Sequence, residues 1–135
     1  MNILIVDGQG GGVGRQLVES IKKAFPNQMI TAVGTNAFAT QAMLKAGADN
    51  AATGENAVIV GCRTADIIVG PVGIVIADSL YGEITPKMAK AIGQSNATRI
   101  LLPMNLCQNY IVGVDKCPTS QMIEDCIAKI KALLV

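Results

Sequence analysis

The sequence contains no histidine and no tryptophan, and it has only two phenylalanines and two tyrosines among 135 residues. Without an imidazole, the chain can form neither a Ser-His dyad nor a histidine-ligated metal site, and we expect no metal. The scarcity of aromatic rings disfavours base stacking on single-stranded nucleic acid. Only 16% of residues are charged and the formal net charge is +1. We therefore expect neither a nucleic-acid partner nor a membrane surface.

The four cysteines, at positions 62, 107, 117 and 126, do not form a CxxC pair. This excludes a zinc knuckle or a thioredoxin-type motif and predicts reduced, mostly buried thiols in a cytoplasmic protein. The longest uncharged apolar stretch, residues 67–77, is interrupted by glycine and proline and is too short to cross a bilayer. The first residues lead directly into the run 3–6 without a basic segment or a cleavage site, which predicts a strand and not a signal peptide.

Half of the residues are hydrophobic, and the length suits one domain with its own core. We expect residues 1–135 to form a single Rossmann-like nucleotide-binding domain. Strand patterns alternate with helix patterns along the chain. The predicted strands are 3–6, 29–33, 49–53, 66–69 and 99–104, and the predicted helices are 12–25, 37–46, 86–95 and 118–134.

Continuous apolar runs such as residues 3–6 are typical of strands buried on both faces of a parallel sheet. This order predicts a doubly wound, three-layer α/β fold with a mostly parallel sheet. Residues 110–114 are also predicted as a strand. Because a parallel crossover needs a dozen or more residues, that strand should lie antiparallel at one edge. Segments 55–62 and 74–83 remain open between helix and strand.

The strongest chemical signal is the run Asp7-Gly8-Gln9-Gly10-Gly11-Gly12-Val13-Gly14-Arg15, between the first strand and the first helix. Glycines let a ligand approach the backbone closely, and the free N–H groups and dipole of a helix N-terminus favour an anion. These nine residues are therefore predicted to bind a small phosphate-bearing ligand, a nucleotide or dinucleotide. The alternative is a turn that serves the structure alone.

The spacing Gly8-x-x-x-Gly12-Val13-Gly14 resembles the TGxxxGIG turn of short-chain dehydrogenases, with Asp7 in place of the threonine. That family carries a Tyr-x-x-x-Lys pair. Here neither Tyr81 nor Tyr110 is followed by a lysine four residues later. The resemblance therefore implies nucleotide binding without that family's catalytic pair.

The turn also resembles the KGGVGKT loop of the ParA/MinD ATPases. In this sequence Gly10 and Arg15 occupy the two lysine positions, and Gln16 occupies the position of the Ser/Thr that binds Mg²⁺. Without that lysine and hydroxyl, we do not expect ATP hydrolysis of the P-loop type.

The end of the second strand bears on the choice of dinucleotide. It reads Gly34-Thr35-Asn36 and has no acidic residue for a ribose 2′-hydroxyl, which disfavours NAD. Arg15, Thr35 and Asn36 offer polar groups for a 2′-phosphate. NADP is accordingly the preferred cofactor within this interpretation.

Further candidates follow the later strands. Gly70, Pro71 and Gly73 either let a nucleoside lie close to the fourth strand or simply turn the chain. Asp78 and Glu83 are candidate general bases, the alternative being helix caps or solvent-facing acids. We expect the apolar run ending at Ala77 to shield Asp78 and raise its pKa.

Three long segments carry a family resemblance. NILIVDGQGGGVGRQLVESIKKAFP, AVGTNAFATQAMLKAGADNAATGENAVIV and ADIIVGPVGIVIADSLYGEITPKMAKAIGQSNATRILLPMN resemble DUF3842, a small bacterial family of domains of unknown function. The resemblance covers nearly the whole chain. It implies a stand-alone cytosolic protein, mostly from anaerobic Gram-positive bacteria, and it supplies no reaction.

Three functional hypotheses follow. The chain binds a nucleotide at residues 8–15 as a sensor or subunit, or it is a small NADP-dependent oxidoreductase-like enzyme with Asp78 or Glu83 as base. Alternatively, it is an oligomeric assembly protein whose glycine turn is structural. A small domain with so few charged residues has little polar surface to cover itself, so we expect a homo-oligomer in each case.

Overall fold

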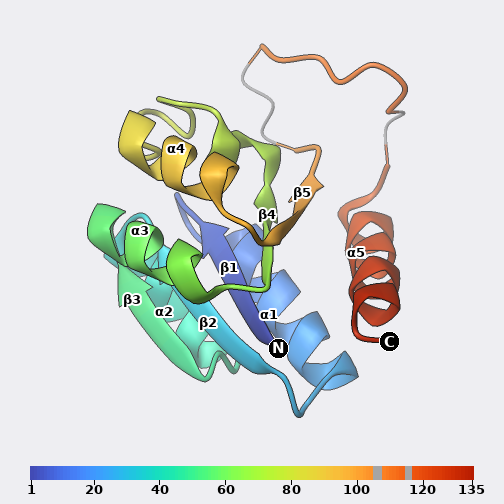
Figure 1. Cartoon of the computed structure of the whole chain (residues 1–135). Coiled ribbons are helices and arrows are strands. Elements are labelled where there is room, and N and C mark those ends of the chain that lie inside the picture. Colours follow the sequence, from blue (N-terminus) through green and yellow to red (C-terminus); the bar gives the residue numbers. More distant parts are fainter. Residues whose placement is uncertain (105–107, 115–116) are drawn as a thin grey trace.

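The computed structural model describes residues 1–104, 108–114 and 117–135. Within them, five strands form one sheet in the order β3-β2-β1-β4-β5, and all neighbouring strands are parallel (Figure 1). The strands are β1 (Asn2–Asp7), β2 (Met29–Gly34), β3 (Asn50–Thr53), β4 (Ile67–Pro71) and β5 (Thr98–Leu102). The helices are α1 (Gly12–Ala24), α2 (Ala37–Lys45), α3 (Glu55–Thr64), α4 (Pro86–Gln94) and α5 (Thr119–Leu133), with a short 3₁₀ turn η1 (Val72–Val75).

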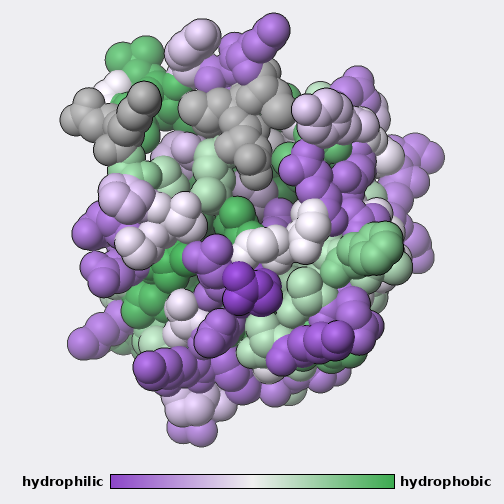
Figure 2. Space-filling view, turned by 180° about the vertical axis from the view of Figure 1, so that it is seen from behind, coloured by the Kyte–Doolittle hydropathy of each residue, from purple (hydrophilic) through white to green (hydrophobic). Residues whose placement is uncertain are grey.

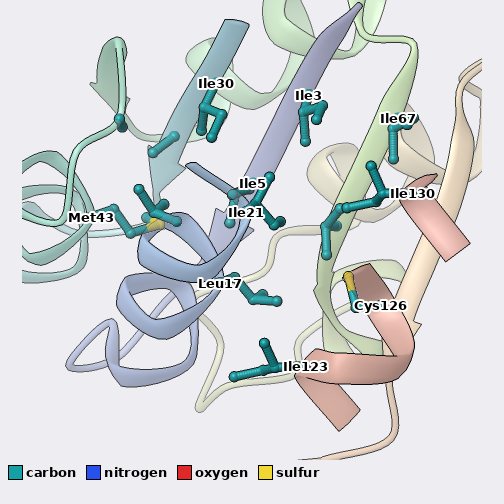
Figure 3. Packing of buried hydrophobic residues seen from close by; sticks show 14 of the residues in the cluster. Ile3, Ile5, Leu17, Ile21, Ile30, Met43, Ile67, Ile123, Cys126 and Ile130 are labelled. Atoms are coloured by element: carbon teal, nitrogen blue, oxygen red, sulfur yellow. The ribbon is translucent and has the colours of Figure 1, made fainter. Parts of the chain in front are cut away.

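The helices cover both faces of the sheet and give three layers. Successive residues of a strand point to opposite faces, and β1 contributes Ile3 and Ile5 to one core and Leu4 and Val6 to the other. The first core packs under α1, α2 and α5 (Figure 3), and the second packs under α3 and α4. Burial on both faces explains why β1 reads as a continuous apolar run.

The predicted antiparallel edge strand at residues 110–114 is wrong. A turn occurs at Val112 and Gly113, and Gly113 adopts a left-handed φ of 85°. The side chains of Tyr110 and Val112 are 92% and 98% exposed. The segment contains three β-branched residues, which favour a strand. It nevertheless pairs with no strand among the described residues and belongs to the connection between β5 and α5.

The two open segments have different structures. Residues 55–62 lie in α3, so the helical alternative is the correct one. Residues 74–83 form neither a regular α-helix nor a strand. After η1 the chain passes through turns in which Asp78, Leu80 and Tyr81 have φ of 66°, 56° and 56°. Three left-handed non-glycine residues so close together make this the most strained part of the described backbone.

The topology places several loops at one edge of the sheet. Because all strands are parallel, the connections that follow their carboxyl ends emerge together. The chain leaves β1 towards α1 on one face and leaves β4 towards α4 on the other. This divergence between neighbouring strands creates the crevice where ligands bind in doubly wound folds. No helix in the described part of the chain is long and apolar enough to cross a membrane.

Candidate functional site

The buried carboxylate of Asp7 holds both ends of the glycine turn by hydrogen bonds to Gly8 and Gly14. The residue is 3% exposed; its Oδ1 accepts the Gly8 N–H at 2.8 Å, and its Oδ2 accepts the Gly14 N–H at 2.7 Å. Burial raises the pKa of Asp7, the two N–H donors partly oppose that rise, and the negative charge of Glu83 adds to it. Asp7 therefore takes one of the N–H groups that a helix N-terminus leaves unpaired.

Three glycines of the turn are required by internal packing. A Cβ on Gly8 would lie 2.5 Å from the Thr35 Oγ1, and a Cβ on Gly14 would lie 2.5 Å from the Met43 Sδ. A Cβ on Gly11 would lie 2.7 Å from the Ala39 Cα, and Gly11 also has a left-handed φ of 72°. These positions hold β1, α1 and the start of α2 close together, with or without a ligand.

Gly10 and Gly12 are different. A Cβ on either would meet no atom within 4 Å, and neither has a left-handed φ. The backbone N–H groups of Gly10, Gly12 and Val13 have no hydrogen-bond partner among the described residues. The N-cap residue of α1, Gly11, has no side chain that could cap them. The turn thus presents open N–H groups at the positive end of a helix, beside two residues that lack side chains.

Glu83 ties three loops together through one oxygen. Its Oε1 accepts the Gln9 N–H at 3.0 Å, the Thr35 hydroxyl at 2.6 Å and the Asn36 Nδ2 at 2.6 Å. Partial burial works to raise the pKa of Glu83, but these three donors outweigh it and hold the pKa below its ordinary value. A carboxylate stabilised in its ionised form is a weak base, so this geometry suits a loop clamp better than a proton acceptor.

The polar groups expected to hold a 2′-phosphate are engaged within the protein. The Thr35 hydroxyl donates to Glu83, and the Asn36 Nδ2 donates to both Glu83 and the Gln9 carbonyl. The Asn36 Oδ1 caps α2 by accepting the Ala39 N–H. Only Arg15 keeps its cation accessible, half-exposed and 3.9 Å from the Glu19 carboxylate. The preference for NADP rested on Thr35, Asn36 and Arg15. Of these, Thr35 and Asn36 already form hydrogen bonds within the protein.

The remaining candidates are buried against their own chain or face solvent. Gly70, Pro71 and Gly73 are buried, with Gly70 against the Val6 carbonyl and Gly73 against Ser79, as expected for a turn packed on its own chain. Asp78 is exposed, and so is Ala77, so the expected shielding of Asp78 is absent. Among the described residues, no group of three or more Cys, Asp or Glu could hold a metal ion.

Two features of this edge were not predicted from the sequence. Leu80 is buried beneath the turn, and its side chain would contact a Cβ on Gly8 at 3.1 Å. Phe38 and Tyr81 are 83% and 97% exposed, although aromatic side chains normally enter the core of a small domain. The one signal available in the sequence was that neither ring belongs to a regular apolar stripe.

Comparison with known proteins identifies a family. No curated protein matches the chain. Among solved structures it is similar to a dodecameric FMN-dependent UbiX-like decarboxylase from Escherichia coli O157:H7, with 14% identity and a TM-score of 0.47 over 99% of this chain and 94% of that chain. A likeness this distant carries no argument about activity. The family described as Domain of unknown function (DUF3842) matches residues 2–135, and the chain belongs to that family.

Proposed function

We propose that the chain binds a nucleotide, with a phosphate group at the N–H groups of Gly10, Gly12 and Val13. The observation that carries this proposal is that Gly10 and Gly12 have no internal reason to be glycine. Glycine in an open helix start costs conformational entropy that alanine would not. Close approach of a ligand to the backbone accounts for both glycines and for the unpaired N–H groups.

The charges around the turn define how a phosphate would approach. Asp7 and Glu83 place two carboxylates on the inner side of the turn, so an anion approaching from there is repelled. The outer side offers the open N–H groups, and Arg15 in the first turn of α1 has a half-exposed guanidinium that could turn towards them. A phosphate on this side would gain hydrogen bonds and a counter-charge together.

Two exposed rings favour a nucleotide over a simple phosphate ester. Phe38 lies two residues after Asn36, and Tyr81 lies two residues before Glu83. Asn36 and Glu83 are hydrogen-bonded at 2.6 Å. Two residues of extended chain span about 7 Å. The backbone of each aromatic residue therefore lies within about 7 Å of the Asn36–Glu83 hydrogen bond beside the glycine turn. A planar base or flavin ring that packs on either side chain would remove exposed aromatic surface from water.

The test is a melting scan of the purified protein with NAD, NADP, ATP, GTP, FMN, coenzyme A and inorganic phosphate. A ligand at about 100 times its Kd adds roughly 2.7 kcal/mol, a shift of several degrees for a chain of this size. We expect a shift with one nucleotide that is larger than the shift with inorganic phosphate. NADP is included because Arg15 could still hold its additional phosphate.

Gly12→Val and Gly93→Val form a matched pair for this test. Gly93 lies in α4, and like Gly12 it has open space around it and no left-handed φ. Gly12→Val should fold and lose the ligand shift, whereas Gly93→Val should keep it. If no nucleotide shifts the melting temperature of protein shown by mass spectrometry to carry no ligand, the turn is structural and the proposal fails.

We also propose that the chain forms a homo-oligomer. Figure 2 shows strongly apolar side chains at the surface. The side chains of Tyr110 and Val112 are 92% and 98% exposed. Water-exposed valine and tyrosine in one short segment favour a protein contact. Sedimentation should show a species larger than 14.0 kDa, and Tyr110→Ser with Val112→Ser should shift it towards the monomer. A monomer at all concentrations would contradict this proposal.

A further inference from the structure

A groove lies between α3 and α4, on the opposite face of the sheet from α1. Its volume is about 470 Å³, and its lining comes from the outer sides of the two helices and from the residues that follow α4. Figure 1 shows α3 and α4 side by side over the sheet. The ends of these helices, at Ala65 and Ser95, precede the amino ends of β4 and β5. The groove therefore opens towards the opposite edge of the sheet from the turn.

The floor of the groove is apolar and firmly held. Ile59, Cys62, Ala65 and Ala91 contribute aliphatic and thiol surface. The Ser95 hydroxyl donates to the Cys62 carbonyl at 3.0 Å and accepts the Ala97 N–H at 3.1 Å, which fixes the end of α4 against the end of α3. Burial raises the pKa of the Cys62 thiol, so this residue contributes apolar surface and not a nucleophile.

The rim of the groove carries positive charge from both helices. Arg63 lies on the α3 side, and Lys87 and Lys90 lie on the α4 side, three positions apart and therefore neighbours on the helix surface. No acidic residue lines the groove. None of the three cations forms an ion pair within the described part of the chain. A chain with a net charge of only +1 thus concentrates three uncompensated cations over an apolar floor.

We propose that this groove binds an acidic amphipathic segment of another protein. The charges lie on both rims, which suits several carboxylates along a segment better than the single headgroup of a small amphiphile. The groove follows α4 from position 87 to position 96, a length of about 14 Å at 1.5 Å per residue. Two to three turns of a helix would fit that length, with apolar residues on the floor and acids on the rims.

A second copy of this chain fits the groove poorly. The sequence contains one pair of adjacent acids, Glu124 and Asp125. Both lie on α5, where Lys129 and Lys131 follow within two turns. The apolar stripe of α5, including Ile123 and Ile130, is buried against its own sheet. The helix that carries the paired acids therefore has no exposed apolar face to place on the floor of the groove.

The experiment measures binding of a fluorescein-labelled 14-residue peptide by anisotropy. Leucines at helical i, i+3, i+4 and i+7 spacing form one face, and glutamates occupy the other positions. The comparison ligands are a scrambled peptide of the same composition, poly-glutamate and laurate. The full-length chain is used as wild type, as Lys87→Glu with Lys90→Glu, and as Lys23→Glu with Lys45→Glu. This last variant makes the same charge change at exposed lysines of α1 and α2.

We expect the amphipathic peptide to bind more tightly than the scrambled peptide, and Kd to rise as salt increases. The groove variant should raise Kd about 10-fold or more, and the control variant should change it less than about 2-fold. Circular dichroism and melting curves would establish that both variants fold.

Five results would overturn the proposal. Equal weakening by the control variant, or equal binding of the scrambled peptide, would mean general charge attraction. Tighter binding of laurate would mean a small amphiphile. A change of oligomeric state in the groove variant would mean a second copy. No binding at about 1 mM peptide would mean that the groove has no acidic partner of this kind.

Discussion

Gly11 and Gly12 are adjacent residues that are glycine for different physical reasons. Gly11 has a left-handed φ, and its Cα faces the backbone of Ala39 in α2. Gly12 opens α1 with ordinary φ and empty space around it. Internal packing thus explains why residue 11 is glycine. It does not explain Gly12, which we attribute to the approach of a ligand. The pair gives a direct means of separating stability from binding.

Gly11→Ala should destabilise the chain and Gly12→Ala should not. An alanine at Gly11 must adopt a left-handed φ and displace the Ala39 backbone, which costs about 2–4 kcal/mol. An alanine at Gly12 meets no atom and should change the free energy of unfolding by no more than about 1 kcal/mol. Urea denaturation measures both, and equal losses would contradict this account of the turn.

Glu83→Gln should reduce stability at neutral pH by about 1–2 kcal/mol, because a charged acceptor of three donors becomes a neutral one. The pKa of Glu83 is depressed in the fold. Its contribution is therefore present above its ordinary pKa and is lost as pH falls through the folded value. The difference between wild type and variant should be largest near pH 7 and shrink below about pH 4.5.

Glu124→Gln is the matched control for the clamp. Glu124 is exposed on α5 and accepts no hydrogen bond in the described part of the chain. Its neutralisation should leave the free energy of unfolding within about 0.5 kcal/mol of wild type at every pH. A pH dependence in Glu83→Gln no larger than that of the control would show that Glu83 does not clamp the loops.

The sequence was sufficient to predict that the glycine run joins a buried strand to a helix at one edge of the sheet. It could not predict the clamp, because Gln9 and Glu83 are 74 positions apart. The same limit applies to Thr35 and Asn36. Their residue types fit a phosphate, but a distant carboxylate engages both of them.

At the level of elements, the predicted strands and helices largely match the observed ones because each is set by a local pattern. The five described strands lie within two residues of their predicted bounds. Residues 110–114 fail because a strand also needs a partner, and pairing is not encoded in alternation or β-propensity alone. Residues 55–62 were ambiguous because helix α3 is apolar on several sides, including an exposed Val60.

The start of α4 provides an element-scale prediction. The Thr85 Oγ1 accepts the Met88 N–H at 3.2 Å and donates to the Glu55 Oε1 at 2.7 Å, which links the starts of α4 and α3. Thr85→Ala should cost about 1–2 kcal/mol by removing this cap. Thr85→Ser keeps the hydroxyl and should retain most of the stability in the same urea titration. Equal losses in the two variants would show that the methyl group matters and the hydroxyl does not.

For the whole molecule, thiol reactivity should report global unfolding. Burial raises the pKa of Cys126 to about 12 and also raises that of Cys62, whereas Cys117 is half-buried. Native protein treated with iodoacetamide at pH 8 should be alkylated at Cys117 well before Cys126, whose thiolate fraction is only about one in ten thousand there. Peptide mass spectrometry distinguishes the sites. Alkylation of Cys126 at the Cys117 rate would mean that α5 opens independently.

The parallel sheet also imposes an order in time. β1 is the central strand, and its residues Ile3, Leu4 and Ile5 pair with residues of β4 that are synthesised 64 positions later. At roughly 5–20 residues per second, one edge of this central strand waits about 3–13 s for its partner on the ribosome. During that interval β1 is an unpaired hydrophobic edge, which is the kind of segment that aggregates or recruits chaperones. The strand that organises the finished molecule is thus also its most vulnerable one during synthesis.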